Sequence, residues 1–81
     1  MLYLVDKSMA DLAFRTAAGD DDARIVLLQD GVVLEPDLDV PTYAVARDVE
    51  VRGVDLPAEI EQITYDRLIE LVVEQETRSF V

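Results

Sequence analysis

The sequence predicts a three-layer α/β domain in which helices flank a mostly parallel sheet of four to five strands. Two observations support this fold class. The apolar runs at 2–5 and 25–28 lack polar alternation, which is typical of strands covered on both faces. Segments with helical spacing of apolar residues alternate with these runs. Because the chain has 81 residues, we expect one domain spanning 1–81.

The first strand is predicted at Leu2 to Val5 and is ended by Asp6-Lys7. Ser8 then has the position of a helix N-cap, with Asp11 three residues later to complete a capping-box-like pair. Gly19 is well placed to end this helix. The apolar stripe of the helix is formed by Met9, Leu12, Ala13, Phe14, Thr16 and Ala17.

The second strand is predicted at 25–28, between three acidic residues at 20–22 and the turn signal Asp30-Gly31. A piece of buried helix is the alternative, but Gly31 comes early for one. The strand, helix and strand together form a unit whose crossover is nearly always right-handed.

After Gly31, the segment 32–34 has room for one short helical turn, and Pro36 prevents a long helix. The third strand is predicted at Thr42 to Ala46. The connection before it is barely long enough for a parallel crossover, so we expect this side of the sheet to be thinly covered. Exposed apolar sheet surface of this kind is a reason to expect a partner.

Asp48 is expected to cap a short helix that runs through Arg52 and ends at Gly53. A short strand is predicted at Glu61 to Thr64. A helix beginning at Pro57 competes with this prediction, because the residues after the proline favour helix.

Thr64 is predicted to cap the last helix, Tyr65 to Val73. The tail from Glu74 to Val81 is either an edge strand or a frayed end. The apolar face of the helix, expected to lie in the core, comprises Tyr65, Leu68, Ile69 and Val72.

The chain has neither cysteine nor histidine. Without cysteine there is no disulfide, thiolate metal site or thiol nucleophile in this subunit. Without histidine the commonest general base and metal ligand is missing. We therefore expect no catalytic residue, no metal site and no cofactor.

The charge is strongly acidic, with 18 Asp and Glu against 7 Lys and Arg and a net charge of −11. Direct binding of nucleic acid is not expected, since the phosphate-neutralising attraction has the wrong sign. The acidity fits an ordinary acidic protein or a salt-loving host, where at about 1 M salt the screening length falls to ~3 Å and crowded carboxylates cost little. No run of 18 apolar residues and no export signal is visible, so a cytoplasmic protein is expected.

Polar residues follow the first two strands: Lys7 and Ser8 after one, and Asp30 with Gly31 after the other. Ligands of open parallel sheets usually bind at the carboxyl ends of strands. Two interpretations stay open, an anion or partner loop held by Lys7 and the helix start, or a plain helix cap and tight turn. A third interpretation is a nucleophilic Ser8 that is activated by Lys7.

The acidic groups at 20–22 and at Asp37 and Asp39 could bind a hard cation, but a solvated loop is the simpler interpretation. Tyr43 and Phe80 are expected at an interface, where aromatic residues are enriched.

Five motifs occur in a characteristic order: Leu-Tyr-Leu-Val-Asp-Lys-Ser at 2–8, Ile-Val-Leu-Leu-Gln-Asp-Gly-Val at 25–32, Tyr-Ala-Val-Ala-Arg-Asp at 43–48, Arg-Gly at 52–53 and Ile-Thr-Tyr-Asp-Arg-Leu-Ile-Glu-Leu at 63–71. In order and spacing they resemble the DsrH/TusB family across nearly the whole chain. The resemblance implies a small DsrEFH-like fold. The motifs of the resemblance and the expected interface aromatics together mark these candidate positions: Lys7, Ser8, Asp30, Gly31, Val32, Tyr43, Arg52, Gly53 and Phe80.

The resemblance also implies a place in a sulfur-relay complex beside DsrE/TusD-like and DsrF/TusC-like subunits, which in the Tus case supports 2-thiolation of the tRNA wobble uridine. DsrH proteins carry a cysteine in the first helix, and this chain has none there. The expected function is therefore a non-catalytic, structural subunit of such a complex. The alternative is a stand-alone homo-oligomer with an unknown ligand.

Overall fold

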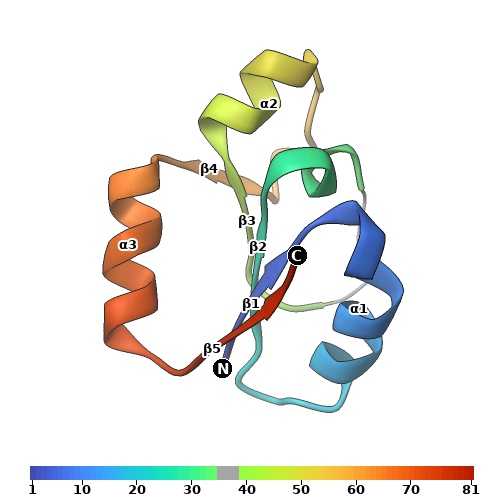
Figure 1. Ribbon diagram of the computed structural model, residues 1–81, viewed down its shortest axis with the longest axis vertical. Helices are drawn as coiled ribbons and strands as arrows, with labels where there is room; N and C mark the ends of the chain where they lie inside the picture. The colour runs from blue at the N-terminus through green and yellow to red at the C-terminus, as the bar shows by residue number, and fades with distance from the viewer. Residues whose placement is uncertain (35–38) are drawn as a thin grey trace.

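The computed structural model describes residues 1–34 and 39–81 and contains a five-stranded, all-parallel sheet in the order β4-β3-β2-β1-β5 (Figure 1). This confirms the three-layer α/β prediction. The 3₁₀ helices are labelled η. In chain order the elements are β1 (Leu2–Val5), η1 (Lys7–Met9), α1 (Ala10–Ala18), β2 (Arg24–Leu27), η2 (Gln29–Val33), β3 (Thr42–Val45), α2 (Ala46–Arg52), β4 (Glu61–Ile63), α3 (Tyr65–Glu74) and β5 (Thr77–Phe80).

The path of the chain decides which face each helix covers. From β1 to β4 each new strand is added on the same side, and the last crossover then returns past the whole sheet to place β5 beside β1. Since parallel crossovers are right-handed, those running in one direction lie on one face, and the reversed crossover lies on the other. α3 is therefore alone on its face, opposite α1 (Figure 1).

The core is divided in the same way. Alternate residues of β1 point to opposite faces, with Tyr3 and Val5 in the cluster of α1 and Leu2 in the cluster of α3. The α1 cluster is completed by Ala10, Ala13, Ala17, Ala23, Ile25, Leu27, Val32, Ala44, Val49 and Phe80. The α3 cluster is completed by Val26, Leu28, Val45, Ile63, Leu68 and Leu71.

The predicted strands are found with small shifts at their ends. The strand of the second apolar run is β2 and is buried on both faces, so the buried-helix alternative is wrong. Leu28 leaves β2 to precede η2, and Ala46 belongs to α2 instead of β3. β4 confirms the strand that competed with a helix from Pro57, although it ends at Ile63. The tail forms an edge strand, β5, and is not frayed.

The start of the first helix differs from the prediction. Ser8 lies inside η1, and the residue that caps this turn is Asp6, whose Oδ1 accepts a hydrogen bond from the Lys7 backbone N–H at 2.7 Å. α1 itself begins at Ala10 and ends, as predicted, before Gly19. Its buried residues are alanines, with Phe14 packed beside them, while Leu12 is exposed because it lies on the opposite side of the helix. Met9, which was expected in the same stripe, is exposed in η1.

The side of the sheet at the crossover from β2 to β3 is covered, so the expectation of thin cover there is wrong. η2 is the predicted short helical turn, and with the segment 54–60 it closes over β3 on the α1 side, so that Ala44 is fully buried. On α3, by contrast, Leu68 and Leu71 are buried, but Tyr65, Ile69 and Val72 are exposed. The expected core stripe of α3 was therefore wrong in three of its four residues, because no helix of the described ranges 1–34 and 39–81 covers that side.

The expectations for Pro36 and Asp37 lie outside the described residues. No helix in the described part of the chain is both long enough and apolar enough to cross a membrane.

Candidate functional site

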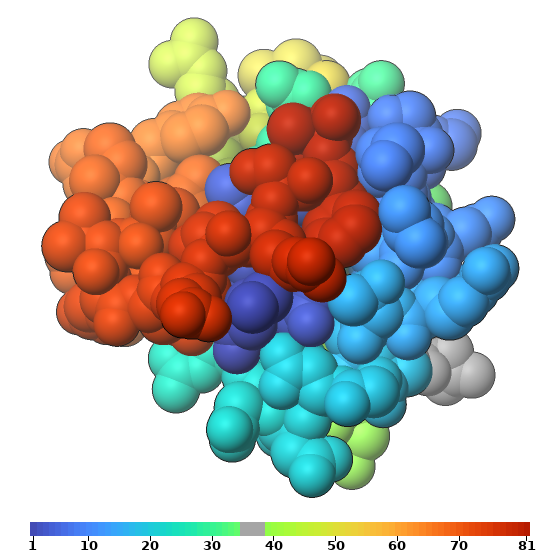
Figure 2. Space-filling view, turned by 60° about the horizontal axis from the view of Figure 1, so that its bottom comes forward, coloured from blue at the N-terminus to red at the C-terminus, as the bar shows by residue number. Residues whose placement is uncertain are grey.

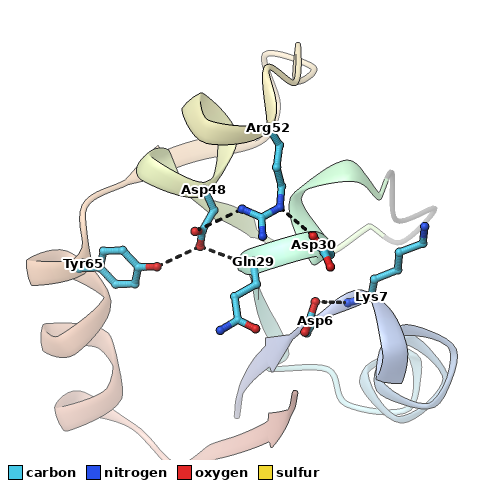
Figure 3. A network of polar contacts seen from close by, with 7 residues as sticks. All are labelled: Asp6, Lys7, Gln29, Asp30, Asp48, Arg52 and Tyr65. Atoms are coloured by element: carbon cyan, nitrogen blue, oxygen red, sulfur yellow. Dashed lines mark hydrogen bonds and ion pairs between the residues drawn. The ribbon is translucent and has the colours of Figure 1, made fainter.

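The carboxyl end of the sheet gathers polar residues from four strand exits (Figure 3). Asp6 and Lys7 follow β1, Gln29 and Asp30 follow β2, α2 follows β3, and Tyr65 opens α3 after β4. Because all strands are parallel, their carboxyl ends meet at one edge of the sheet. Residues far apart in the sequence are therefore brought together there.

The centre of this group is Asp48, a buried carboxylate in the first turn of α2. Its Oδ2 accepts hydrogen bonds from the Gln29 backbone N–H at 2.8 Å and from the Tyr65 hydroxyl at 3.1 Å. Its Oδ1 lies 3.6 Å from Nη1 of Arg52. The sequence suggested that Asp48 caps α2, but this is wrong, because the helix begins two residues before Asp48. It joins α2, η2 and α3 instead.

Arg52 extends the contact to a second carboxylate. Its Nε donates to Oδ1 of Asp30 at 2.9 Å, so one guanidinium bridges Asp30 on η2 and Asp48 on its own helix. We call the set Asp30, Asp48, Arg52, Tyr65 and the Gln29 backbone the Asp48 network. Two of the residues marked by the resemblance, Asp30 and Arg52, thus bind each other.

The backbone under the Asp48 network is tightly packed. Gln29 has a left-handed φ of 52°, and the Leu28 N–H donates to the Val5 carbonyl at 3.1 Å. A Cβ on Gly31 would overlap the Val5 carbonyl oxygen and lie 3.2 Å from the Asp6 Cα. Glycine at 31 is therefore required by the close approach of η2 to the end of β1.

Lys7 and Ser8 lie outside the network. Both side chains are exposed, and Lys7 points away from Asp48 (Figure 3). Among the described residues no hydrogen bond joins Ser8 to Lys7. Lys7 and Ser8 form the 3₁₀ turn η1 with Met9, and the residue that caps this turn is Asp6.

The remaining marked positions lie outside the Asp48 network. Val32 is fully buried, and Gly53 ends α2 with a left-handed φ of 62°. Tyr43 is half-buried in the α3 cluster. Phe80 is buried on the α1 side, where its ring stacks on Tyr3 at a centroid distance of 5.8 Å. Phe80 also borders an open groove of about 430 Å³, whose other lining residues are Leu12, Thr16, Arg78 and Ser79.

The acidic loop at 20–22 is used by the protein itself. Asp20 accepts hydrogen bonds from the Asp22 backbone N–H at 3.0 Å and from the Tyr3 hydroxyl at 3.1 Å, and it lies 3.5 Å from the N-terminal ammonium. The Asp22 N–H first, and then the other two groups, lower the pKa of Asp20 below its ordinary value. In the described ranges no three acidic residues are placed to hold a metal ion.

Partial burial, and then the hydrogen bond to Asp48 and its charge, raise the pKa of Tyr65 above its ordinary value. The Tyr65 hydroxyl therefore stays protonated and donates to the carboxylate. Among the described residues, every buried polar side-chain atom has a partner. The Asp48 network therefore fastens three chain segments, η2, α2 and α3, to one another.

The sequence marked Asp30 and Arg52, suggested Asp48 as a helix cap, and gave no role here to Gln29 and Tyr65, which donate to Asp48. A signal was present, since Asp48 and Tyr65 each follow a predicted strand, where parallel topology brings residues together.

No family model matches the chain, and no curated protein sequence matches it. Among solved structures, the chain is similar to the protein Tm0979 from Thermotoga maritima, which was determined by solution NMR. The TM-score is 0.64 at 25% identity, and the alignment covers 94% of this chain and 95% of that chain. The two chains are therefore similar in fold over nearly their whole lengths. The name of that protein states no activity.

Proposed function

We propose that this chain is a non-catalytic subunit of a sulfur-relay complex of the TusBCD/DsrEFH type. It packs beside DsrE/TusD-like and DsrF/TusC-like subunits whose cysteines carry the sulfur, and it shapes the complex. The order of its five motifs, which resembles the DsrH/TusB family, supports this assignment, and the small parallel α/β fold is compatible with it.

The observation that carries the non-catalytic role is the Asp48 network. Asp30 and Arg52 are the polar residues that the resemblance marks after β2 and in α2, and Arg52 binds Asp30 at 2.9 Å and Asp48 at 3.6 Å. Their polar atoms are thereby used to hold η2, α2 and α3 together. A sulfur relay needs a thiolate, and the chain has no cysteine. Its part in such a relay is therefore to support subunits that have one.

In the Tus case the relay ends in 2-thiolation of the tRNA wobble uridine, and in the Dsr case in other sulfur trafficking. Contact with tRNA falls to other members of the complex, because a chain with a net charge of −11 repels phosphates.

The second candidate function is that of a stand-alone homo-oligomer with an unknown ligand. It is favoured by the apolar side chains that α3 leaves exposed, which a second copy could cover. This candidate needs no sulfur pathway.

The test is to purify the tagged protein from its own host at native salt and to measure the intact complex by native mass spectrometry. The expected result is a hetero-oligomer containing cysteine-bearing subunits of similar fold and a stoichiometric amount of this chain. A homo-oligomer with no other subunit would contradict the proposal. Sulfane sulfur attached to the isolated chain would contradict its non-catalytic part.

A further inference from the structure

One side of α3 carries an apolar stripe that the protein leaves uncovered. Its residues are exposed by 44% (Tyr65), 61% (Ile69), 38% (Val72) and 81% (Val73). They are spaced at i, i+4, i+7 and i+8, so they form a continuous strip along the ten-residue helix, and we call them the α3 stripe. In Figure 2, α3 stands at the outer side of the molecule beside β5.

This concentration is unusual for the molecule. Nine large hydrophobic residues are exposed among the described ones, and four of them lie on this single helix. The other five, Met9, Leu12, Val33, Val51 and Val81, each lie in a different segment. Scattered exposed hydrophobics need no explanation, whereas a contiguous strip marks an interaction surface.

The α3 stripe is bordered by a row of acids. Asp66, Glu70 and Glu74 follow one another at i, i+4 and i+8, and all three are exposed. At 100° per residue this row lies directly beside the stripe, on the side away from the buried Leu68 and Leu71. Arg67 is the only cation on the helix, and it pairs with Glu70 at 3.0 Å. Because one cation stands against three carboxylates, the acidic row keeps a net negative charge.

We infer that the α3 stripe docks a different protein, whose surface presents an apolar ridge bordered by lysine or arginine. The charge pattern of α3 favours a different protein over a second copy of this chain. In an antiparallel pairing of two copies, the acidic rows would face each other, and each copy brings a net charge of −11. A basic border on the partner matches the acidic row, and its apolar ridge covers the stripe.

This inference deepens the proposed function and rests on it for the existence of a partner subunit. It adds the face that makes the contact and the chemistry of the partner's surface. The Asp48 network contributes by holding the first residue of α3, since the Tyr65 hydroxyl is bonded to Asp48. The stripe is therefore presented on a helix anchored at its start.

Four variants test the inference in the full-length tagged protein. Ile69→Ser with Val73→Ser removes apolar surface from the α3 stripe, and Glu70→Lys with Glu74→Lys reverses the acidic row. Val51→Ser and Glu50→Lys are the matched controls, because both residues are exposed on α2. All changes are at exposed positions, and circular dichroism with thermal unfolding verifies that each variant folds.

The measurements are quantitative recovery of the wild-type partner from the host and the Kd of the reconstituted pair. We expect the stripe variant and the row variant each to weaken binding by about tenfold or more, whereas the two controls bind as wild type does. The row variant should lose most at low salt. Carbodiimide coupling of carboxylates to amines should join Glu70 or Glu74 to partner lysines.

The outcomes separate the two proposals. A cysteine-bearing partner that binds the stripe variant undiminished overturns the inference and leaves the proposed function standing. A basic partner that needs the stripe but lacks cysteine overturns the proposed function and supports the inference. A purified wild-type dimer that the stripe variant dissociates overturns the inference in favour of a second copy, and recovery of no partner at all overturns both.

Discussion

Gly31 lies where η2 crosses the end of β1, and there is no space for a side chain. We predict that Gly31→Ala destabilises the protein by about 1–3 kcal/mol, because the added Cβ must displace the Val5 backbone. Gly19→Ala is the control, since a Cβ there meets only the Thr16 carbonyl at 3.7 Å. Urea unfolding measures both. Equal stabilities for the two variants would contradict the close approach.

Asp48 is the residue on which three segments depend. We predict that Asp48→Ala costs about 1–3 kcal/mol, because the Gln29 N–H and the Tyr65 hydroxyl lose their acceptor. Tyr65→Phe should cost about 0.5–1.5 kcal/mol, since it removes one hydrogen bond. The double variant should cost less than the sum, as expected for a shared contact.

Glu50→Ala, an exposed carboxylate of the same helix, is the control for Asp48→Ala and should stay within about 0.5 kcal/mol of wild type. Denaturant unfolding of all four variants completes the cycle. Additive costs for Asp48→Ala and Tyr65→Phe would show that the hydrogen bond between them contributes nothing.

Tyr3 and Tyr65 make stability depend on alkaline pH. Burial, and then hydrogen bonds to Asp20 and Asp48, raise the pKa of both above the ordinary 10.0. Since the folded protein holds these protons more tightly than the unfolded chain, this stabilisation is fully present below about pH 10 and is lost as the pH rises through the raised values.

Urea unfolding between pH 8 and 11 should therefore show stability falling above about pH 10. The fall should be smaller in the double variant Tyr3→Phe and Tyr65→Phe, which cannot ionise at these positions. An unchanged fall in that variant would assign the effect to other groups.

At the scale of elements, the start of α1 depends on the residue before the turn. Asp6 caps η1 through its side chain, whereas Ser8 is an exposed residue inside it. We predict that Asp6→Ala costs about 0.5–2 kcal/mol and that Ser8→Ala stays within about 0.5 kcal/mol of wild type. Thermal unfolding compares the stabilities of the two variants. A larger loss of stability in Ser8→Ala would show that Ser8 is the capping residue, as the sequence predicts.

α3 shows how the surroundings of an element decide which of its residues are buried. Tyr65 to Glu74 forms an amphipathic helix whose cap, Thr64, accepts a hydrogen bond from the Arg67 N–H at 3.1 Å, as its sequence predicts. Only Leu68 and Leu71 of this helix are buried, because the helix has the sheet on one side and, in the part of the chain that the structure describes, no other helix on the other.

At the scale of the whole molecule, the connections make the two faces of the sheet unequal. One face is covered by α1, η2 and the residues around α2, and the other by α3 alone. Five strands span about 20 Å between the outer two, whereas a helix is about 10 Å wide. In the described part of the chain α3 therefore has no second helix beside it on its face, and its α3 stripe stays exposed.

The net charge of −11 gives the whole domain a self-repulsion that salt screens. We predict that raising sodium chloride from about 0.1 M to about 1 M increases the Tm, because the screening length falls from about 10 to 3 Å. The variant Asp11→Asn, Asp21→Asn, Glu59→Gln removes three charges and should gain less. An equal gain in both proteins would point to salting-out of apolar surface.

The sequence by itself determined the fold class, the first four strands along the chain and the two long helices. The buried runs at 2–5 and 25–28, the glycines at 19 and 53 and the cap at Thr64 act locally, so their structural meaning can be inferred from neighbours along the chain. The absence of cysteine and the acidic charge are also properties of composition alone.

The tertiary structure decided the rest. Whether Asp48 caps a helix or joins three segments depends on which strand exits meet, and that is set by strand order, which local patterns do not contain. Likewise, Ile69 and Val73 have the same apolar character as Leu68 and Leu71, and only the position of α3 on an otherwise bare face separates the exposed pair from the buried pair. Burial is a relation between distant segments, so it appears only when the sheet is assembled.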